Sequence, residues 1–229
     1  MNLSITWKYL LAFIALNMIA GELHEQVHIN TGYLICGCYG TRDFNVWNTC
    51  AQCNHPAWAF LATLAGPLFS CSLMWLGTCM FLKCSRLSGK SIGFSILFAN
   101  LPFARIFTAL TGRGDEKVVL QTLLGDDGNM ITIKLLNVLL VSLICLPPII
   151  LVFKKLDRTN RWWVITGFSV LPLLFGMLYQ RMLLNQLLQN GFGADIFMIG
   201  TPNIILFHFI LMLMILYRFR KSIPGLLVK

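Results

Sequence analysis

Long apolar runs without ionisable side chains constrain this chain more than any other feature. Ala57–Leu82 comprises 26 residues without Asp, Glu, Lys, Arg or His, and Leu135–Phe153 and Trp162–Gln180 each comprise 19. Ile196–Tyr217 carries only His208. Because a transmembrane helix needs roughly 20 apolar residues, each of these four segments is predicted to span a membrane.

Two further spans are predicted from segments that contain polar residues. The first runs over roughly Trp7–Ala20 and continues as helix into His28, and the second, Ser91–Leu110, is interrupted by Arg105. A signal peptide is disfavoured, since no small-residue cleavage site follows the first run. We therefore expect an all-α membrane protein, a bundle of about six transmembrane helices forming a single polytopic domain over residues 1–229.

The composition supports a membrane protein and narrows the partners. Hydrophobic residues make up 57% of the chain and charged residues 12%, about half the ~25% of soluble domains. A soluble domain with so few charges could not cover its surface, and disorder, collagen-like fibres and small disulfide scaffolds are excluded. The net charge of +9 is expected to fix membrane orientation, so the lipid bilayer rather than nucleic acid is the expected partner.

The basic residues predict which loops face the cytoplasm. They follow the second, fourth and sixth predicted spans: Lys83, Arg86, Lys90; Lys154, Lys155, Arg158, Arg161; Arg218, Arg220, Lys221. By the positive-inside rule, both termini are cytoplasmic and the loops near 29–56, 111–130 and 189–201 face outward. For so compact a chain we expect a bacterial inner membrane.

One motif at the end of the first span carries recognisable chemistry. His24-Glu25-Gln26-Val27-His28 reads H-E-x-x-H. Residues four apart share a helix face, so His24 and His28 can bind one Zn²⁺ ion. Glu25 lies beside that face and can act as general base toward a metal-activated water. The alternative is a pair of histidines and an acid that cap a helix at the interface, but ionisable groups beside a span are costly and usually functional.

A zinc hydrolase needs a third protein ligand, and only nine acidic residues are available. Asp115 and, second, Glu116 are favoured, because they follow the third span and emerge on the same side as His24. His55 is the other plausible ligand. Five further acids lie in the Cys-rich loop, a predicted turn, a basic inner loop and a Gly-rich outer loop: Asp43; Asp126 and Asp127; Asp157; Asp195.

Further motifs give the chain a family resemblance. H-E-x-x-H is followed by Ala65-Gly66-Pro67-Leu68 in the next span and by Asn100-Leu101-Pro102 in the third. Over about residues 18–116 this resembles the site-2 protease family of intramembrane zinc metalloproteases and its small bacterial relatives. The resemblance implies a three-span metalloprotease core within residues 1–116, with additional spans over 117–229, and a membrane-associated polypeptide as substrate.

The chain departs from the family pattern in two respects. The family's Asp ligand usually lies within a few residues of the Asn-Pro segment, whereas the first acid here is Asp115. The family's zinc is accessible from the cytosol, whereas the charge distribution puts His24 on the opposite side.

Four residues of the shared region have open roles. Gly66-Pro67 is expected to break its helix and let another backbone approach. Asn100 is expected to bind substrate or to steady Glu25, with simple packing as the alternative. Arg105 either neutralises an acid near the metal or extends to water.

Four of the eight cysteines lie in one predicted outward loop, at Cys36, Cys38, Cys50 and Cys53. Disulfides are favoured because the loop faces a non-cytoplasmic compartment; a structural zinc site and a redox-active C-x-x-C are the alternatives. Glycines around Tyr33-Leu34-Ile35 and Phe44-Asn45-Val46-Trp47 predict a stapled β-hairpin at the membrane surface, able to present an edge strand to substrate or to act as a lid.

Three functions fit these features. A zinc metalloprotease leads. A zinc hydrolase of a lipid, amide or ester is the second, because a metal-activated water can attack any carbonyl. A non-enzymatic metal-binding or redox scaffold, or a transporter, is the third, although a transporter would ordinarily carry polar residues at mid-membrane in several spans.

Overall fold

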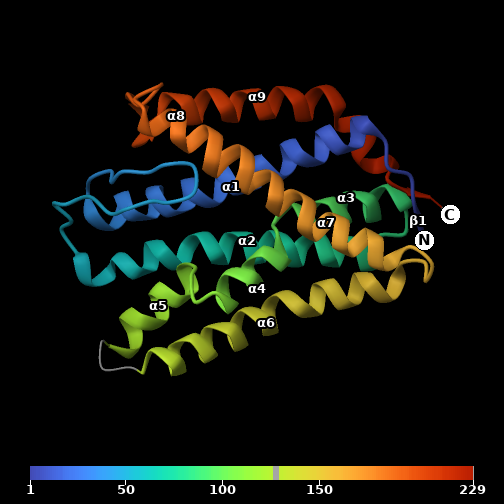
Figure 1. Ribbon diagram of the computed structural model, residues 1–229, viewed down its shortest axis with the longest axis horizontal. Helices are drawn as coiled ribbons and strands as arrows, with labels where there is room; N and C mark the ends of the chain where they lie inside the picture. The colour runs from blue at the N-terminus through green and yellow to red at the C-terminus, as the bar shows by residue number, and fades with distance from the viewer. Residues whose placement is uncertain (126–128, 229) are drawn as a thin grey trace.

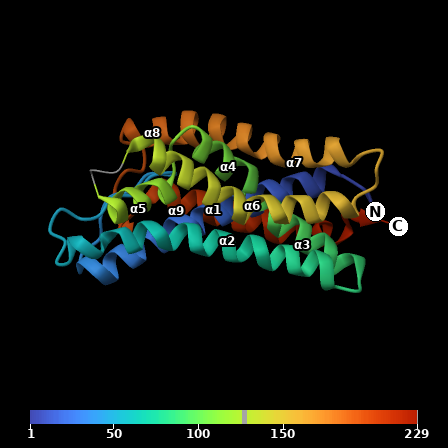
Figure 2. The same ribbon diagram turned by 90° about the horizontal axis from the view of Figure 1, so that it is seen from below.

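A computed structural model describes residues 1–125 and 129–228, so the predicted turn acids Asp126 and Asp127 lie outside the described residues. The chain is 75% helical. The helices are α1 (Trp7–Cys36), α2 (Ala59–Lys83), α3 (Leu87–Ala99), α4 (Pro102–Leu110), α5 (Asp115–Leu124), α6 (Met130–Lys155), α7 (Arg161–Phe175), α8 (Asn185–Gln189) and α9 (Asn203–Phe219). The long helices lie side by side along the long axis of the molecule (Figures 1 and 2).

Short elements connect the helices. They are the strands β1 (Asn2–Leu3), β2 (Ile196–Met198), β3 (Thr201–Pro202) and β4 (Leu227–Val228), the 3₁₀ segments Pro56–Trp58 and Arg220–Gly225, and a π-helix over Gly176–Leu184. Strand β1 pairs antiparallel with β4, and β2 with β3. The first pairing places the two termini side by side at one end of the bundle (Figure 1).

Five helical segments of the described chain are long and apolar enough to cross a membrane. They are Pro56–Lys83, Leu87–Leu110, Met130–Lys155, Arg161–Gln189 and Asn203–Gly225. They correspond to five of the six predicted spans. The sixth, α1, is 30 residues long, about 45 Å, but polar residues that include the H-E-x-x-H segment lower its mean hydropathy.

Helix α1 runs further than predicted, and this overturns the predicted hairpin. The Thr6 side chain accepts a hydrogen bond from the backbone N–H of Tyr9 and begins the helix. Tyr33-Leu34-Ile35, predicted as a strand, forms its last turn, and Gly37 ends it in the left-handed conformation (φ 75°). The following loop contains a single bridge, between Arg42 and Trp47. The predicted pairing of residues 33–35 with 44–47 is therefore wrong, and the hairpin in this loop is a short turn over residues 41–48.

The second and third predicted spans also differ in their local breaks. The expected break at Gly66-Pro67 is wrong, since α2 continues through Pro67. The break falls instead at Asn100-Leu101, where Leu101 has φ 50° and Pro102 begins α4. Proline suits the first turn of a helix because its missing N–H would be unpaired there. The break separates α3 from α4, the helix that contains Arg105.

The main core lies where α1, α3 and α7 meet, toward the end that holds the termini. Its centre is a group of buried aromatic rings, with Phe168 of α7 packed edge-on against Phe13 and Phe94. Within this core the Tyr9 hydroxyl is 2.9 Å from the Ser95 hydroxyl. The interior at this end is therefore almost wholly apolar, and the polar clusters lie elsewhere.

Candidate metal centre

The two histidines of H-E-x-x-H and Asp115 meet at the end of the bundle away from the termini. His24 and His28 lie one turn apart on α1, and their Nε2 atoms are 3.0 Å apart. Oδ2 of Asp115, the first residue of α5, lies 3.4 Å from each Nε2. These are the three side chains that the sequence predicts as zinc ligands, and they converge although Asp115 follows His28 by 87 residues (115 − 28).

The spacing of the three atoms fits a tetrahedral metal ion. Bonds of about 2.0–2.1 Å to nitrogen and oxygen, at tetrahedral angles, separate the ligand atoms by about 3.3–3.4 Å. The observed separations of 3.0, 3.4 and 3.4 Å are close to these values. Two imidazoles and a carboxylate are also a usual donor set for zinc with one position left open. The residues present therefore fit a zinc ion.

Second contacts fix the orientation of both imidazole rings. Nδ1 of His28 lies 2.7 Å from the carbonyl oxygen of Ala62 in α2, which accepts its proton. Nδ1 of His24 is 3.0 Å from the Ser70 hydroxyl. A ring nitrogen that donates to a carbonyl oxygen, as Nδ1 of His28 does, is typical of a metal-bound histidine, because it leaves Nε2 free to bind the ion.

Gly66 of α2 makes room for the His28 ring. A Cβ atom at this position would overlap the imidazole. The close approach at the Gly-Pro step is therefore made by the His28 side chain and not, as the sequence predicts, by another backbone.

Asp115 is distinguished from its two rivals by its surroundings. Burial would raise the pKa of Asp115, but hydrogen bonds from His24 and His28 outweigh it and hold the pKa of the carboxyl well below its usual range. Glu116 instead pairs with Arg105, with Nη1 and Oε1 3.0 Å apart. His55 is exposed and lies outside the cluster.

Arg105 connects the ion pair to the histidines. Its Nη1 binds Oε1 of Glu116, and its Nη2 lies 3.1 Å from Nδ1 of His24. Of the two roles predicted for Arg105, neutralising an acid near the metal site is the one observed.

Glu25 faces a cavity beside the three ligands. Its side chain is 8% exposed, and among the described residues its Oε2 has no hydrogen-bond partner. The cavity has a volume of about 580 Å³ and is lined by both Glu25 and Asp115. A buried carboxylate oxygen without a partner is costly, and its position beside the cluster suits a general base that awaits water or substrate.

The Cys-rich loop forms one wall of this cavity. Cys36 pairs with Cys53 and Cys38 with Cys50, so the predicted disulfides are present and their connectivity is nested. The loop places the indole of Trp47 against the His28 ring, with centroids 5.3 Å apart and planes 12° apart. Residues 45–49 line the cavity. The loop is thus a structural part of the centre.

A buried ion pair anchors the same loop to α1. The guanidinium of Arg42 donates two hydrogen bonds of 2.8 Å to the carboxylate of Glu22, two residues before His24. Sequence reasoning missed Arg42, Glu22 and Trp47. The scarcity of charges was the available signal, because a glutamate inside an apolar helix needs a partner.

Asn100 lies apart from the cavity. It caps the end of α3, and its side-chain amide donates to the carbonyl of Ile96 at 2.8 Å. Its Oδ1 is buried without a partner among the described residues. Asn100 is not among the residues that line the cavity beside Glu25, so contact with a substrate there stays a prediction.

Comparison with known proteins adds no family assignment. No family model, curated protein or solved structure matches this chain. The resemblance to site-2 proteases therefore rests on the motifs themselves, and the function has to be argued from the geometry of this site.

Proposed function

We propose that this chain is a membrane-embedded, zinc-dependent hydrolase, a metalloprotease that cleaves a membrane-associated polypeptide. The observation that carries the proposal is the convergence of His24, His28 and Asp115 within 4.8 Å of one another, beside a cavity that Glu25 lines. One carboxylate oxygen of Glu25 is buried without a partner among the described residues. Three ligands with one open position, next to a carboxylate base, are the parts that metal-assisted hydrolysis requires.

Each residue has a defined task in this proposal. His24, His28 and Asp115 would hold the zinc ion, which when bound would lower the pKa of a water molecule to near neutrality. The Glu25 carboxylate would accept a proton from the attacking water and transfer it to the leaving amine of the cleaved peptide bond. Arg105 keeps Glu116 paired, so that Glu116 does not compete for the metal. Trp47 and the disulfide-bonded loop screen the His28 side of the site from bulk water.

The cavity lining favours a polypeptide over a lipid. Amide and hydroxyl side chains reach the cavity from the loop, from α2 and from α5, among them Asn48, Thr63 and Thr122. Such groups can pair with the backbone N–H and C=O groups of an extended peptide, which are costly to leave unpaired. The apolar side chains in the same lining, among them Val46, Phe60 and Val118, can contact the side chains of such a peptide.

The proposed placement in the membrane follows from where the charged loops lie. The α2–α3 and α6–α7 loops lie at the same end as both termini (Figure 1), and they carry the basic residues. With α1 as a sixth span, this end faces the cytoplasm of a bacterial inner membrane. The His24, His28 and Asp115 side chains and both disulfides then lie toward the outer, oxidising side.

The test compares wild type with Glu25→Gln in purified full-length protein. Peptides and phospholipids labelled for cleavage serve as substrates, and zinc content is measured on the same samples. We expect wild type to cleave peptides, and Glu25→Gln to retain zinc while losing turnover by at least about 100-fold. Undiminished cleavage by Glu25→Gln would contradict the mechanism, and cleavage of lipids alone would contradict the substrate class.

A further inference from the structure

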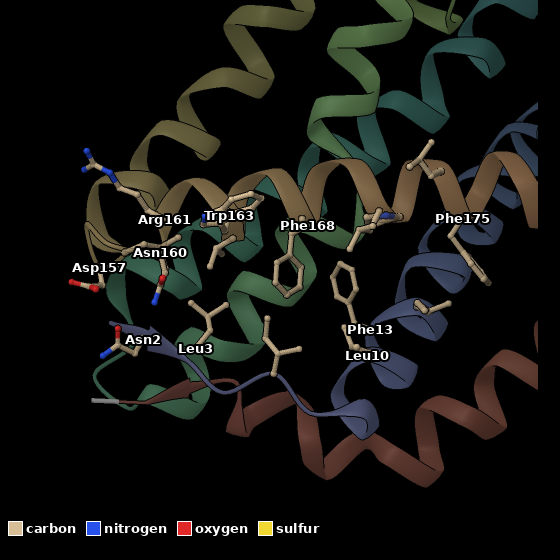
Figure 3. A pocket seen from close by; sticks show the side chains of 18 of the residues that line it. Asn2, Leu3, Leu10, Phe13, Asp157, Asn160, Arg161, Trp163, Phe168 and Phe175 are labelled. Carbon is tan, nitrogen blue, oxygen red and sulfur yellow. The ribbon is translucent and has the colours of Figure 1, made fainter.

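The second half of the chain, residues 117–229, supplies none of the proposed zinc ligands, yet it contacts the first half at both ends of the bundle. At the end that holds the termini the contact is apolar. A groove of about 710 Å³ lies there between α1 and α7, and Leu10, Phe13 and Phe168 lie along it (Figure 3). At the end that holds the proposed ligands, hydrogen bonds join the second half to the Cys-rich loop and to α1.

Asn185 is at the centre of this polar contact. The residue is 6% exposed, and its Oδ1 accepts a hydrogen bond of 3.1 Å from the backbone N–H of Phe44. Its Nδ2 donates to Oδ1 of Asn45 at 3.3 Å. The π-helix Gly176–Leu184 directly precedes Asn185. Because a π-helix has more residues in each turn than an α-helix, it changes the direction in which Asn185 points relative to α7.

The Phe44 side chain fixes the loop at the same place by packing. Phe44 is 3% exposed and lies in a buried cluster with Leu184, Ile204 and Ile205, which come from the end of the π-helix and the start of α9. A buried aromatic ring contributes substantially to packing. The loop is therefore attached to the second half of the chain by a buried ring as well as by the two hydrogen bonds of Asn185.

A short turn connects Phe44 to the wall of the cavity. The Asp43 carboxylate accepts hydrogen bonds of 2.6 and 2.7 Å from the backbone N–H groups of residues 45 and 46. Such contacts of an aspartate with its own backbone stabilise a turn locally. Residues 45–49 line the cavity beside Glu25. Because the turn is short and internally bonded, a displacement of Phe44 moves this wall of the cavity.

A further hydrogen bond from the second half holds α1. Gln26, which lies between the two histidines of the motif, donates from Nε2 to Oγ1 of Thr201 at 2.9 Å. Thr201, in β3, is fully buried. The second half of the chain thus contacts both the loop wall and the helix that carries His24 and His28, and it holds one against the other.

We propose that Asn185 is a positioning residue for the metal centre, which through Phe44 and Asn45 fixes the loop wall of the cavity at the distance from α1 at which a peptide binds. Asn185 is not among the residues that line the cavity, so its effect on a substrate passes through the loop. The kinetic part of this inference rests on the proposed hydrolysis, whereas the positioning of the loop does not.

The experiment measures peptide cleavage and amide hydrogen exchange of the full-length protein with zinc in excess. Asn185→Ala should raise KM about tenfold and change kcat by less than about twofold, because one lost hydrogen bond corresponds to about two- to tenfold. It should also speed the exchange of residues 43–49 by at least about tenfold. Thr201→Val removes a hydrogen bond to α1 and should leave that exchange unchanged. Gln186→Ala, at the exposed neighbour of Asn185, should match wild type in both measurements.

Asn45→Ala tests the same contact from the loop, at an exposed residue whose replacement leaves the core intact. Because Asn45 and Asn185 share one hydrogen bond, the double variant should raise KM by less than the product of the two single effects. Fully multiplicative effects would contradict a connection through Asn45.

Unchanged exchange of residues 43–49 in Asn185→Ala would overturn the proposal. So would an equal acceleration in Thr201→Val, which would indicate a general loosening of the interface. A fall in kcat at unchanged KM would also contradict it, since the effect would then lie at the metal ligands. If wild type cleaves no peptide, the proposed hydrolysis fails, and hydrogen exchange alone decides whether Asn185 positions the loop.

Discussion

The two ends of this molecule use their charged residues in opposite ways. At the end formed by α5 and the disulfide-bonded loop, charges pair inside the protein: Glu22 with Arg42 at 2.8 Å, Glu116 with Arg105 at 3.0 Å, and Asp115 with two histidines. At the end that holds the termini, Lys154, Lys155 and Arg158 are exposed, and the interior is apolar.

The difference shows at which end of the protein charged side chains are removed from water. Burying a charge is unfavourable unless it is paired and hydrogen-bonded, and the internal pairs lie around the proposed metal ligands. The basic side chains at the other end are exposed, so they need no partner inside the protein. Substitutions should therefore be severe at the first end and mild at the second.

The largest contrast is expected between two buried histidines. His28→Ala removes a zinc ligand and should lower zinc affinity by more than about 100-fold, since even outer-shell contacts contribute about 10–100-fold. His208, in α9, is also buried, but its Nε2 has no partner among the described residues. His208→Ala should keep wild-type affinity in a titration with a competing chelator. Equal losses of zinc affinity in the two variants would contradict the assignment of His28 as a zinc ligand.

Breaking the buried ion pair comes next. Arg42→Ala leaves Glu22 buried without its partner and should destabilise the protein by about 3–5 kcal/mol, measured by thermal unfolding in detergent. Lys154→Ala, on the exposed surface of the other end, should change stability by less than about 0.5 kcal/mol. The double variant Glu22→Gln with Arg42→Met should recover part of the loss. If it does not, the loss does not come from the unpaired charge.

Removing the Cys36–Cys53 disulfide should lower stability slightly less than breaking the Arg42–Glu22 pair does. Cys36 and Cys53 are 17 residues apart, and closing a loop of this length contributes about 3 kcal/mol. The double variant Cys36→Ser with Cys53→Ser should lose about that much stability, together with part of its zinc affinity, since the loop holds Trp47 against His28. Cys79→Ser, at an exposed free thiol of α2, is the control. Full zinc affinity in the double variant would show that the loop does not contribute to the metal site.

Two glycines provide the finest comparison. Gly66→Ala places a methyl group against the His28 ring and should weaken zinc binding by about 10–100-fold while the fold persists. Gly167→Ala adds the same atom in open space on α7 and should be neutral or slightly stabilising. Circular dichroism checks the fold of both variants. Unchanged zinc affinity in Gly66→Ala would show that the ring does not need its observed position.

The sequence predicts correctly the features that depend on local periodicity or on the small number of charged residues. The spacing of His24 and His28 places both on one helix face wherever the helix lies, and Asp115, the favoured candidate for a third ligand, lies beside them. That these three side chains bind zinc stays a prediction. Five apolar runs fold as helices of membrane-spanning length, because their hydrophobicity does not depend on their neighbours.

The parts that the sequence does not predict depend on contacts between distant residues. Tyr33-Leu34-Ile35 has strand-like composition, but α1 continues through it until Gly37 and the first disulfide. Pro67 stays inside a helix that is packed against α1 and α3. The Arg42–Glu22 pair and the stacking of Trp47 on His28 join a loop to a helix with no repeating pattern between them.

The zinc content of the purified full-length protein tests the central claim most directly. The measurement is elemental analysis of wild type and of His24→Ala, both prepared without chelators. The account predicts one zinc per chain in wild type and close to none in the variant. A wild-type protein without zinc, or a variant that retains it, would contradict the assignment of His24, His28 and Asp115 as a metal centre.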